Sequence, residues 1–374
     1  MAAIGLCLLL VGIAPAADSL NVRLVGTIDT PGSAMKLALS GQYLYVADSD
    51  SGLLVISIAD PRHPVEVGHC AMPSSVNDVV VNGSYAYVAD GDSGLGVISI
   101  ADPSHPVEVG HCYSPGGAWV AVSGDYAYLA GIGLRVISIT DPTHPVEVAY
   151  PDSGETHDVD AGGSYVYVAA GASLLVFSVI DPTHPVKIGE CSTFENNYGV
   201  TVNGEYAYCP YVGTFGIISV ADPAHPSEVA WLYVGGPVLG VTVSGDYAYV
   251  ACCGGLRVIL VSDRANPIYA GHYWGTSDRA RDVAVAGNLI YVAQREFGIE
   301  ICEFYGGGVE ENPRLQAVGR RLEPTVIRSL PRGAVAFDAM GRRALNPKPG
   351  VYFVRDEGLG AGYVGRTRKI VITR

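Results

Sequence analysis

Charged side chains are scarce in this sequence, at 16% of its 374 residues, against about 25% in an average soluble domain. Phe and Trp are also few, with 7 and 3 copies, whereas Tyr occurs 23 times. No segment between residues 20 and 305 repeats its apolar residues with the helical period. These shortages exclude a disordered acidic protein, a coiled coil and a helical bundle. The sequence instead has 49% hydrophobic residues, 47 Gly and 23 Pro, which favours many short strands joined by tight turns.

Basic residues are rare except at the C-terminal end. Residues 306–374 carry 13 Lys/Arg and 6 Asp/Glu, a net charge of +7, whereas residues 1–305 carry 10 Lys/Arg and 31 Asp/Glu, a net charge of −21. An acidic main body repels phosphate backbones, which argues against nucleic-acid binding. The reversal of sign predicts a domain boundary. We expect a main domain over 18–305, a linker over 306–322 and a small basic β domain over 323–374.

Long apolar runs are missing as well. No segment after the first residues has 18 consecutive apolar side chains, so we predict no transmembrane segment. Residues 1–17 are typical of a signal peptide, because the apolar stretch 4–13 is short and ends in Ala14-Pro15-Ala16, a small-x-small cleavage pattern. The protein is therefore expected outside the cytoplasm, either secreted or at the cell surface.

The cysteines follow no metal-binding pattern. Seven remain after residue 17, and their spacings do not match the paired motifs of zinc sites. Buried free thiols are the favoured interpretation, with one or two disulfides as the alternative. The seven are Cys70, Cys112, Cys191, Cys209, Cys252, Cys253 and Cys302.

An internal repeat dominates the sequence. The segment Gly-x-Tyr-x-Tyr-Val-Ala, with some substitutions, recurs at intervals of 39 to 42 residues. Its seven copies begin at Gly41, Gly83, Gly124, Gly163, Gly204, Gly245 and Gly287. A second segment, Asp-Pro-x-His-Pro, begins at Asp60, Asp102, Asp141, Asp181 and Asp222. A period near 41 residues indicates a propeller or a solenoid.

Each repeat contains four expected strands and no helix. In the second repeat these are Asp78–Asn82, 85–89, 95–100 and 107–112, separated by turn residues. Four antiparallel strands repeated seven times predict an all-β, seven-bladed β-propeller.

The two ends of the repeat region predict how the ring closes. The seventh repeat lacks a fourth strand, whereas Val22–Ile28 has the pattern of a fourth strand and precedes the first repeat. We expect Val22–Ile28 to pair with Ile299–Phe304, which removes an open sheet edge and locks the ring.

The third-strand segments at 54–61, 95–103 and 134–142 read Leu-(Gly/Arg)-Val-Ile-Ser-Ile-x-Asp-Pro, with one residue fewer in the first. Together with the Tyr-x-Tyr segments they resemble the LVIVD repeat, and the resemblance covers residues 21–305. It implies a bacterial propeller that is exported or displayed on the cell surface. No common enzymatic activity is attached to this repeat.

The basic C-terminal region contains short strand-like segments. Residues 341–343, 349–355 and 368–374 resemble parts of the type IX secretion sorting domain. That resemblance implies a small β-sandwich read by an export machine of the bacterial outer membrane, so the secretion machinery would be a partner. A generic β-sandwich stalk is the alternative.

Two repeated features resemble metal-binding motifs but are better explained as turns. The histidines of the Asp-Pro-x-His-Pro segments recur at the outer end of separate blades, far beyond the ~2 Å at which zinc binds its ligands. The loops that begin at Asp48 and Asp90 resemble the front half of a calcium loop, but Ala59 and Ala101 stand where its distal glutamate belongs. Asx turns explain both loops, and we predict no metal site and no cofactor.

The candidate ligand site lies where the innermost strands begin. Five residues before each repeat glycine, the side chain varies from blade to blade, and in a closed ring these positions converge on one mouth of the axial channel. Repeated residues serve packing, whereas varied ones can serve a ligand. The predicted ligand-binding residues are Lys36, Asp78, Trp119, Asp158 and Asp282. Alternatively, the aspartates cap loops between blades by accepting backbone N–H groups.

Catalytic signatures such as Gly-x-Ser-x-Gly and His-Glu-x-x-His are absent, so no catalytic residue is assigned. We predict a non-catalytic binding or adhesion scaffold with a glycan or protein ligand at the channel mouth. One alternative is an extracellular hydrolase or lyase that acts on a polysaccharide or peptide in the axial pocket, because carboxylates are expected at the channel of a closed ring. Another is a purely structural component of the cell envelope.

Overall fold

The structure is a computed structural model that describes residues 19–306, apart from 194, 253–254 and 276–279, together with five strands between 325 and 372. The predicted signal peptide 1–17 and nearly all of the predicted linker 306–322 lie outside the described residues. The chain divides into two compact units, Met1–Gly307 and Gly308–Arg374. No helix in the described residues is long and apolar enough to cross a membrane.

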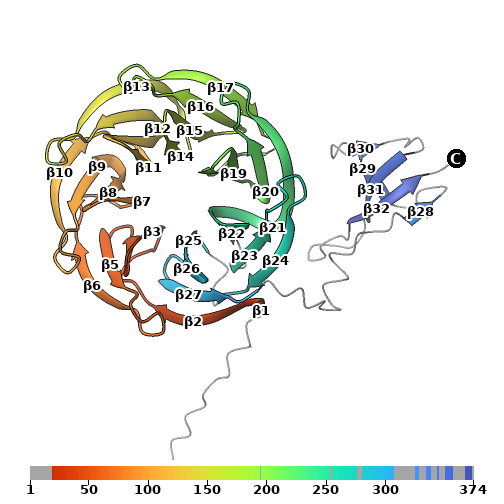
Figure 1. Ribbon diagram of the computed structural model, residues 1–374, viewed down its shortest axis with the longest axis horizontal. Helices are drawn as coiled ribbons and strands as arrows, with labels where there is room; N and C mark the ends of the chain where they lie inside the picture. The colour runs from red at the N-terminus through yellow and green to blue at the C-terminus, as the bar shows by residue number, and fades with distance from the viewer. Residues whose placement is uncertain are drawn as a thin grey trace, which may run out of the picture. The chain divides into compact units, whose positions relative to one another are not determined.

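The first unit is a ring of seven antiparallel blades (Figure 1), which confirms the predicted all-β propeller. Blades 1 and 2 consist of Lys36–Ser40 (β3), Tyr43–Ala47 (β4), Leu53–Ser57 (β5) and Val65–Cys70 (β6), then Asp78–Asn82 (β7), Tyr85–Asp90 (β8), Gly94–Ser99 (β9) and Val107–Tyr113 (β10), with a 3-10 turn at Gly91–Ser93 (η1). Blades 3 and 4 consist of Gly117–Ser123 (β11), Tyr126–Ser138 (β12) and Val146–Glu155 (β13), then Asp158–Gly162 (β14), Tyr165–Ala170 (β15), Ser173–Ser178 (β16) and Val186–Ser192 (β17). Blades 5 to 7 consist of Thr201–Asn203 (β18), Tyr206–Pro210 (β19), Val212–Ser219 (β20), Ser227–Ser244 (β21), Tyr247–Cys252 (β22), Gly255–Leu260 (β23), Ile268–Tyr273 (β24), Asp282–Ala286 (β25), Leu289–Ala293 (β26) and Ile299–Phe304 (β27).

Two long strands depart from the repeat. The first half of β12 pairs with β11 and its second half pairs with β13. Likewise β21 pairs with β20 along its first half and with β22 along its second half, so the outer strand of blade 5 continues into the inner strand of blade 6.

The N-terminal strand closes the ring as predicted. Val22–Ile28 (β2) pairs antiparallel with β27, from Val22 opposite Phe304 to Ile28 opposite Ile299. The preceding short strand Ser19–Leu20 (β1) pairs with β24, the outer strand of blade 6. The same N-terminal segment thus ties blade 6 to blade 7 by backbone hydrogen bonds, and closure leaves no unpaired edge on β27.

The hydrophobic core is distributed between the blades. Seven clusters of buried side chains each contain residues of two neighbouring blades, and each includes one tyrosine of the Tyr-x-Tyr segments. These tyrosines are Tyr45, Tyr87, Tyr128, Tyr167, Tyr208, Tyr249 and Tyr291. A large aromatic ring fills the wedge between twisted sheets, so the tyrosine pattern serves packing.

The repeated histidines stabilise turns on the rim. His63, His105, His144, His184 and His225 each place Nδ1 2.9–3.1 Å from the carboxylate of the aspartate three residues earlier. Their side chains are largely exposed. Among the described residues, no three His, Cys, Asp or Glu side chains are grouped to hold a metal ion.

The two calcium-like loops instead position neighbouring backbone. Asp48 is fully buried and accepts hydrogen bonds from the Gly32 N–H at 2.7 Å and the Thr30 hydroxyl at 2.8 Å. Asp90 accepts the Ser74 N–H at 3.1 Å. Each carboxylate therefore fixes the segment that enters its own blade, as expected for turn-forming aspartates.

Five cysteines are buried free thiols, which agrees with the favoured interpretation for these positions: Cys70, Cys112, Cys191, Cys209 and Cys302. Cys253 lies outside the described residues.

The described strands of the second unit form one mixed five-stranded sheet in the order β28-β32-β31-β29-β30. They are Thr325–Ile327 (β28), Ala334–Phe337 (β29), Arg343–Ala344 (β30), Gly350–Asp356 (β31) and Thr367–Ile372 (β32). The predicted sorting or stalk role of residues 323–374 stays a prediction.

Candidate functional site

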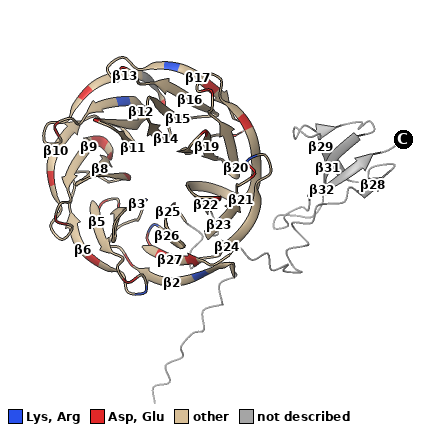
Figure 2. Cartoon of the chain, in the orientation of Figure 1, with Lys and Arg blue, Asp and Glu red and all other residues tan. Residues whose placement is uncertain are grey.

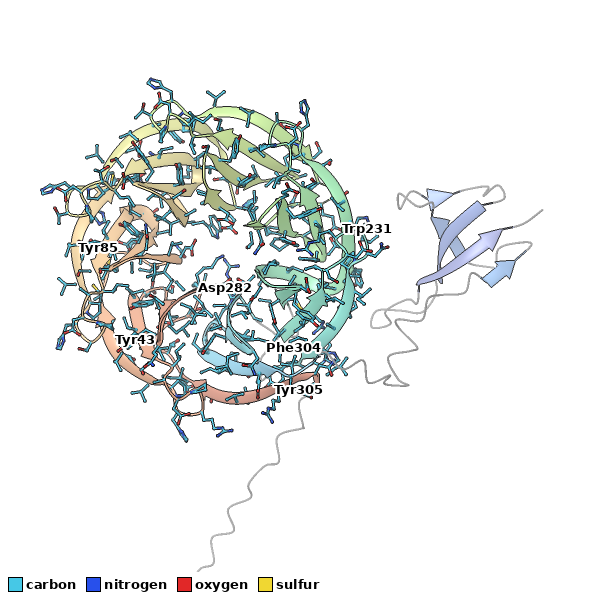
Figure 3. All side chains as sticks on the ribbon, viewed as in Figure 1. Tyr43, Tyr85, Trp231, Asp282, Phe304 and Tyr305 are labelled. Carbon is cyan, nitrogen blue, oxygen red and sulfur yellow. The ribbon has the colours of Figure 1, made fainter. Side chains whose placement is uncertain are left out.

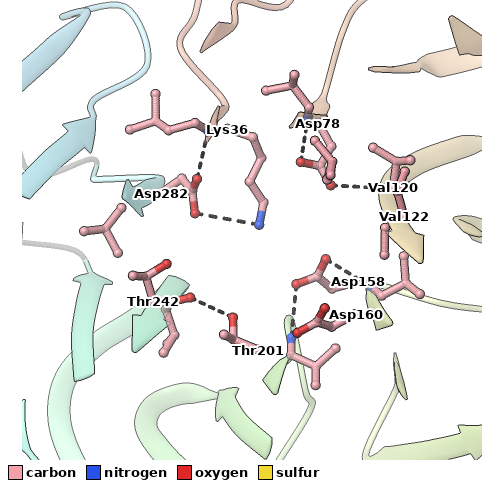
Figure 4. A pocket seen from close by; sticks show the side chains of 17 residues that line it. Lys36, Asp78, Val120, Val122, Asp158, Asp160, Thr201, Thr242 and Asp282 are labelled. Atoms are coloured by element: carbon pink, nitrogen blue, oxygen red, sulfur yellow. Dashed lines mark hydrogen bonds and ion pairs between the residues drawn. The ribbon is translucent and has the colours of Figure 1, made fainter. Parts of the chain in front are cut away.

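Four of the five predicted site residues converge on the ring axis. Lys36, Asp78, Asp158 and Asp282 are the first residues of β3, β7, β14 and β25, and they line a cavity of about 230 Å³. Figure 3 places Asp282 near the centre of the ring, and Figure 4 shows the four side chains directed toward the same space.

Asp78 and Asp158 hold neighbouring inner strands together. Asp78 accepts the N–H of Val79 at 2.8 Å and that of Val120, in the next blade, at 2.9 Å. Asp158 accepts the N–H of Val159 and that of Val200, both at 3.0 Å. Two backbone donors per carboxylate is the capping arrangement that the sequence left as the alternative.

Asp282 makes a third contact of this kind and also faces the lysine. Its Oδ2 accepts the Leu37 N–H at 3.0 Å, which joins blade 7 to blade 1. Its Oδ1 lies 3.7 Å from the ammonium of Lys36, which is only partly exposed. This ion pair lies across the same blade junction as the hydrogen bond, and Figure 4 shows the lysine chain extending inward from β3.

Burial and repulsion between the carboxylates raise the pKa values of two aspartates in the cavity. Burial raises the pKa of Asp78 to about 7, and Lys36 opposes that shift. Burial likewise raises the pKa of Asp158. For Lys36, burial favours the neutral amine, but the surrounding carboxylates, Asp158 first, outweigh it and hold the pKa above its ordinary value. The lysine therefore keeps its charge, while one acid titrates near neutrality.

Sequence reasoning missed Asp160, which also lines the cavity. It accepts the N–H of Ala161 at 2.7 Å and that of Val202 at 2.6 Å, and burial raises its pKa to about 6. Residues two apart on a strand share a face, so its position two residues after Asp158 was the available signal.

Glycines occupy the equivalent positions of blades 5 and 6, where an added Cβ would lie too close to neighbouring atoms, at Gly199 first to Cγ of Pro210 at 2.7 Å. A Cβ on Gly199 would lie 3.0 Å from Oδ2 of Asp158, and a Cβ on Gly240 would lie 2.7 Å from Oδ1 of Asp282. The glycines at these two positions therefore leave room for aspartates that line the axial cavity.

Trp119 does not join this cavity, contrary to the predicted grouping. It lines a second pocket of about 450 Å³ with Glu155, Thr156 and His157. β13 runs on to Glu155, which pairs with Ile132 of β12, and these two residues line the second pocket together with Trp119.

A comparison with known protein families identifies the repeat of this chain. Seven copies of the LVIVD repeat match the chain, at residues 31–72, 73–114, 115–150, 153–193, 197–231, 235–274 and 278–301. The chain belongs to the LVIVD repeat family. No curated protein matches it.

Two solved structures resemble this LVIVD propeller in fold. A chain in the crystal structure of the mitotic checkpoint complex is 10% identical, with a TM-score of 0.64, over 82% of this chain and 99% of that chain. The computationally designed protein Ika8 is 8% identical, with a TM-score of 0.56, over 75% of this chain and 99% of that chain. At such identities the likeness concerns the fold alone.

The axial cavity of the LVIVD propeller has a defined chemical character. The residues that line it supply one ammonium group, four carboxyl groups and the hydroxyls of Thr201 and Thr242, and they include no histidine, cysteine or serine. Thr201 already donates its hydroxyl to the Val241 carbonyl at 2.7 Å. Such a lining suits recognition of a small polar group more than covalent chemistry.

Proposed function

We propose that this protein is an exported or cell-surface propeller that acts as a non-catalytic binding or adhesion scaffold, with a polar ligand such as a glycan or peptide at the axial mouth. The observation that carries the proposal is the Lys36 ammonium held among buried aspartates. It is the one lysine or arginine among the residues that line the cavity, and its neighbours fix its position. A preorganised charged donor of this kind is suited to orienting a ligand.

The hydrogen bonds of the acids favour binding over turnover. Both oxygens of Asp78 and of Asp158 accept backbone N–H groups. A general acid or base must present an oxygen to the substrate, whereas these oxygens are engaged in joining strands. The repeat family likewise supports a repeat scaffold.

An extracellular hydrolase or lyase acting on a polysaccharide or peptide is the second candidate. One observation favours it: the pKa of Asp78 is raised to about 7, and a carboxylic acid with a pKa near the working pH suits general acid catalysis. The two candidates differ in whether any product accumulates.

A binding screen with purified residues 18–305 tests the proposal. Glycan and peptide arrays should yield a ligand whose affinity falls at least tenfold in Lys36→Met, measured well below the melting temperature of this variant, which should be lowered because the ion pair with Asp282 is lost. Lys187→Met is the matched control, because Lys187 lies on an outer strand and pairs with Glu190 at 2.6 Å. Product formation from the captured ligand, abolished by Asp78→Asn, would replace the scaffold by the enzyme. Absence of any ligand would favour a structural envelope component.

The C-terminal unit is proposed to act in export. Its basic composition, with 13 Lys/Arg among residues 306–374, and its resemblance to a type IX sorting domain support delivery through the bacterial outer envelope. The secretion machinery would then be its partner.

A further inference from the structure

A second pocket lies between blades 3 and 4 and shares no lining residue with the axial cavity. It has a volume of about 450 Å³ and is lined by Trp119, Gly131, Ile132, Glu155, Thr156 and His157. This volume is in the range of small-ligand sites, about 300–1,000 Å³. The proposed function does not use it.

The pocket has a fixed backbone frame. The Thr156 hydroxyl accepts the Gly131 N–H at 2.7 Å and lies 3.3 Å from the carbonyls of Gly131 and Gly133. Gly133 has a φ of +80°, a conformation that glycine adopts readily, so the hairpin bends tightly here. Ile132, which is 63% exposed, pairs with Glu155 across the sheet. The wall of the pocket is therefore built from paired strands.

Three aromatic rings follow one another across blades 3, 4 and 5. The rings of Trp119 and His157 meet edge to face with centroids 6.5 Å apart. The rings of His157 and Tyr198 are tilted, with centroids 5.7 Å apart. Of these rings, Trp119 and His157 line the pocket, and the face of an indole carries negative electrostatic potential.

The charge beside these rings is negative and uncompensated. The Glu155 side chain makes no hydrogen bond or ion pair with any described residue, and the same holds for the imidazole nitrogens of His157. Residues 1–305 carry a net charge of −21. Figure 2 shows acidic residues on outer strands around the ring and few basic ones. The surrounding field therefore attracts cations.

We propose that this pocket binds the cationic side chain of a basic peptide, an arginine guanidinium above all. A guanidinium stacks on an indole face and forms paired hydrogen bonds with a carboxylate, and Trp119 and Glu155 supply these two groups in one pocket. A neutral sugar would also stack on the indole and donate hydroxyl hydrogen bonds to the carboxylate, but it would gain nothing from the acidic surroundings.

The test compares N-acetyl-arginine-methylamide with its citrulline analogue, a neutral ligand of nearly the same shape, by NMR titration of the purified propeller. The arginine compound should bind at least about tenfold more tightly, and its affinity should fall as salt is added. Glu155→Gln should remove about tenfold of that affinity. Trp119→Leu, which keeps apolar volume against the core, should remove about fivefold.

Glu205→Gln is the control, because it removes the same charge at the far end of the inner strand β18, where the opposite mouth lies. It should leave binding unchanged, as should Lys36→Met, which separates this site from the axial one. Equal affinity for the citrulline compound, tighter binding of methyl glycosides, or full affinity in Glu155→Gln would overturn the proposal.

Discussion

Asp78 joins two neighbouring blades and interacts with the charge of Lys36 in the axial cavity. Asp78 bridges the start of β7 to Val120 of β11, and its carboxyl faces Lys36 across the cavity. The cost of burying this group is offset by the hydrogen bonds that it accepts from the N–H groups of Val79 and Val120. The same side chain therefore joins two blades and lines the proposed ligand site, and its charge changes with pH.

We expect the stability of the propeller to decrease as pH rises from about 4 to about 7, and Asp78→Asn to reduce that dependence. Burial raises the pKa of Asp78 from 3.8 to about 7. An acid with a raised folded-state pKa holds its proton more tightly when folded, so its stabilisation is present at low pH and lost as pH rises through the folded value. Because one pKa unit corresponds to about 1.4 kcal/mol, the free energy of unfolding lost over this window should be smaller by on the order of 4 kcal/mol in Asp78→Asn. Urea unfolding at several pH values measures it.

Asp263→Asn is the control for that experiment. The hydrogen bonds from the Asn266 side chain and the Ala265 N–H lower the pKa of Asp263, so its contribution is lost only as pH falls through the acidic range. Between pH 5 and 8 the difference between Asp263→Asn and the unaltered protein should be constant. An equal slope for Asp78→Asn and the unaltered protein would contradict the assigned titration.

The buried thiols predict slow chemical modification. Burial raises the pKa of the thiols of Cys70, Cys112 and Cys191, and it does so more strongly for Cys209 and Cys302. Because the thiolate is the reactive form, these five should resist iodoacetamide in the native protein and react within minutes in denaturant. Mass spectrometry of peptides checks this. Rapid labelling of native Cys209 would show that its blade opens readily.

At the scale of elements, we expect the stability of the propeller to depend on β2, the strand that closes the ring. Deleting residues 20–30 removes β2 and leaves β27 with an unpaired edge, so the free energy of unfolding should fall by on the order of 5 kcal/mol, or folding should fail. A melting temperature that survives this deletion would mean that the ring does not depend on β2.

Gly298→Ala is a milder test of the same closure. Gly298 begins the turn into β27 with a φ of +70°, and an added Cβ would clash with the Ile28 carbonyl of the closing strand. We expect a loss of about 1–3 kcal/mol. Gly162→Ala is the matched control, since no atom lies within 4 Å of its would-be Cβ and its φ is not positive. Equal effects of the two changes in thermal unfolding would argue against strain at the closure.

Elements that repeat could be predicted from the sequence, and those that break the repeat could not. Seven copies of a 41-residue pattern fix the blade number, and the missing fourth strand of the last copy predicts the partner of Val22–Ile28. Trp119 was misplaced because the equivalence of blades assumes equal hairpins, whereas β12 and β13 are lengthened. Asp160 was missed because its blade counterparts are apolar or small, so only its strand period marked it.

At the scale of the whole molecule, the two compact units predict independent stability. A protein ending at residue 305 should retain the melting temperature of the ring, because the unit boundary lies at Gly307. In a host with type IX export, the truncated protein should fail to reach the cell surface. Fractionation with an epitope-tagged protein measures this. Normal surface delivery of the truncated form would leave residues 323–374 as a stalk.

The pairing of β2 with β27 also determines when the ring can close during synthesis. Val22 is made 282 residues before its partner Phe304, which at about 5–20 residues per second separates the two by roughly 15–60 s. Throughout that interval the first strand has no partner, and six blades can assemble while the seventh waits. The ring therefore cannot be completed until almost the whole repeat region has been synthesised, and its last strand pairing uses the residues that were made first.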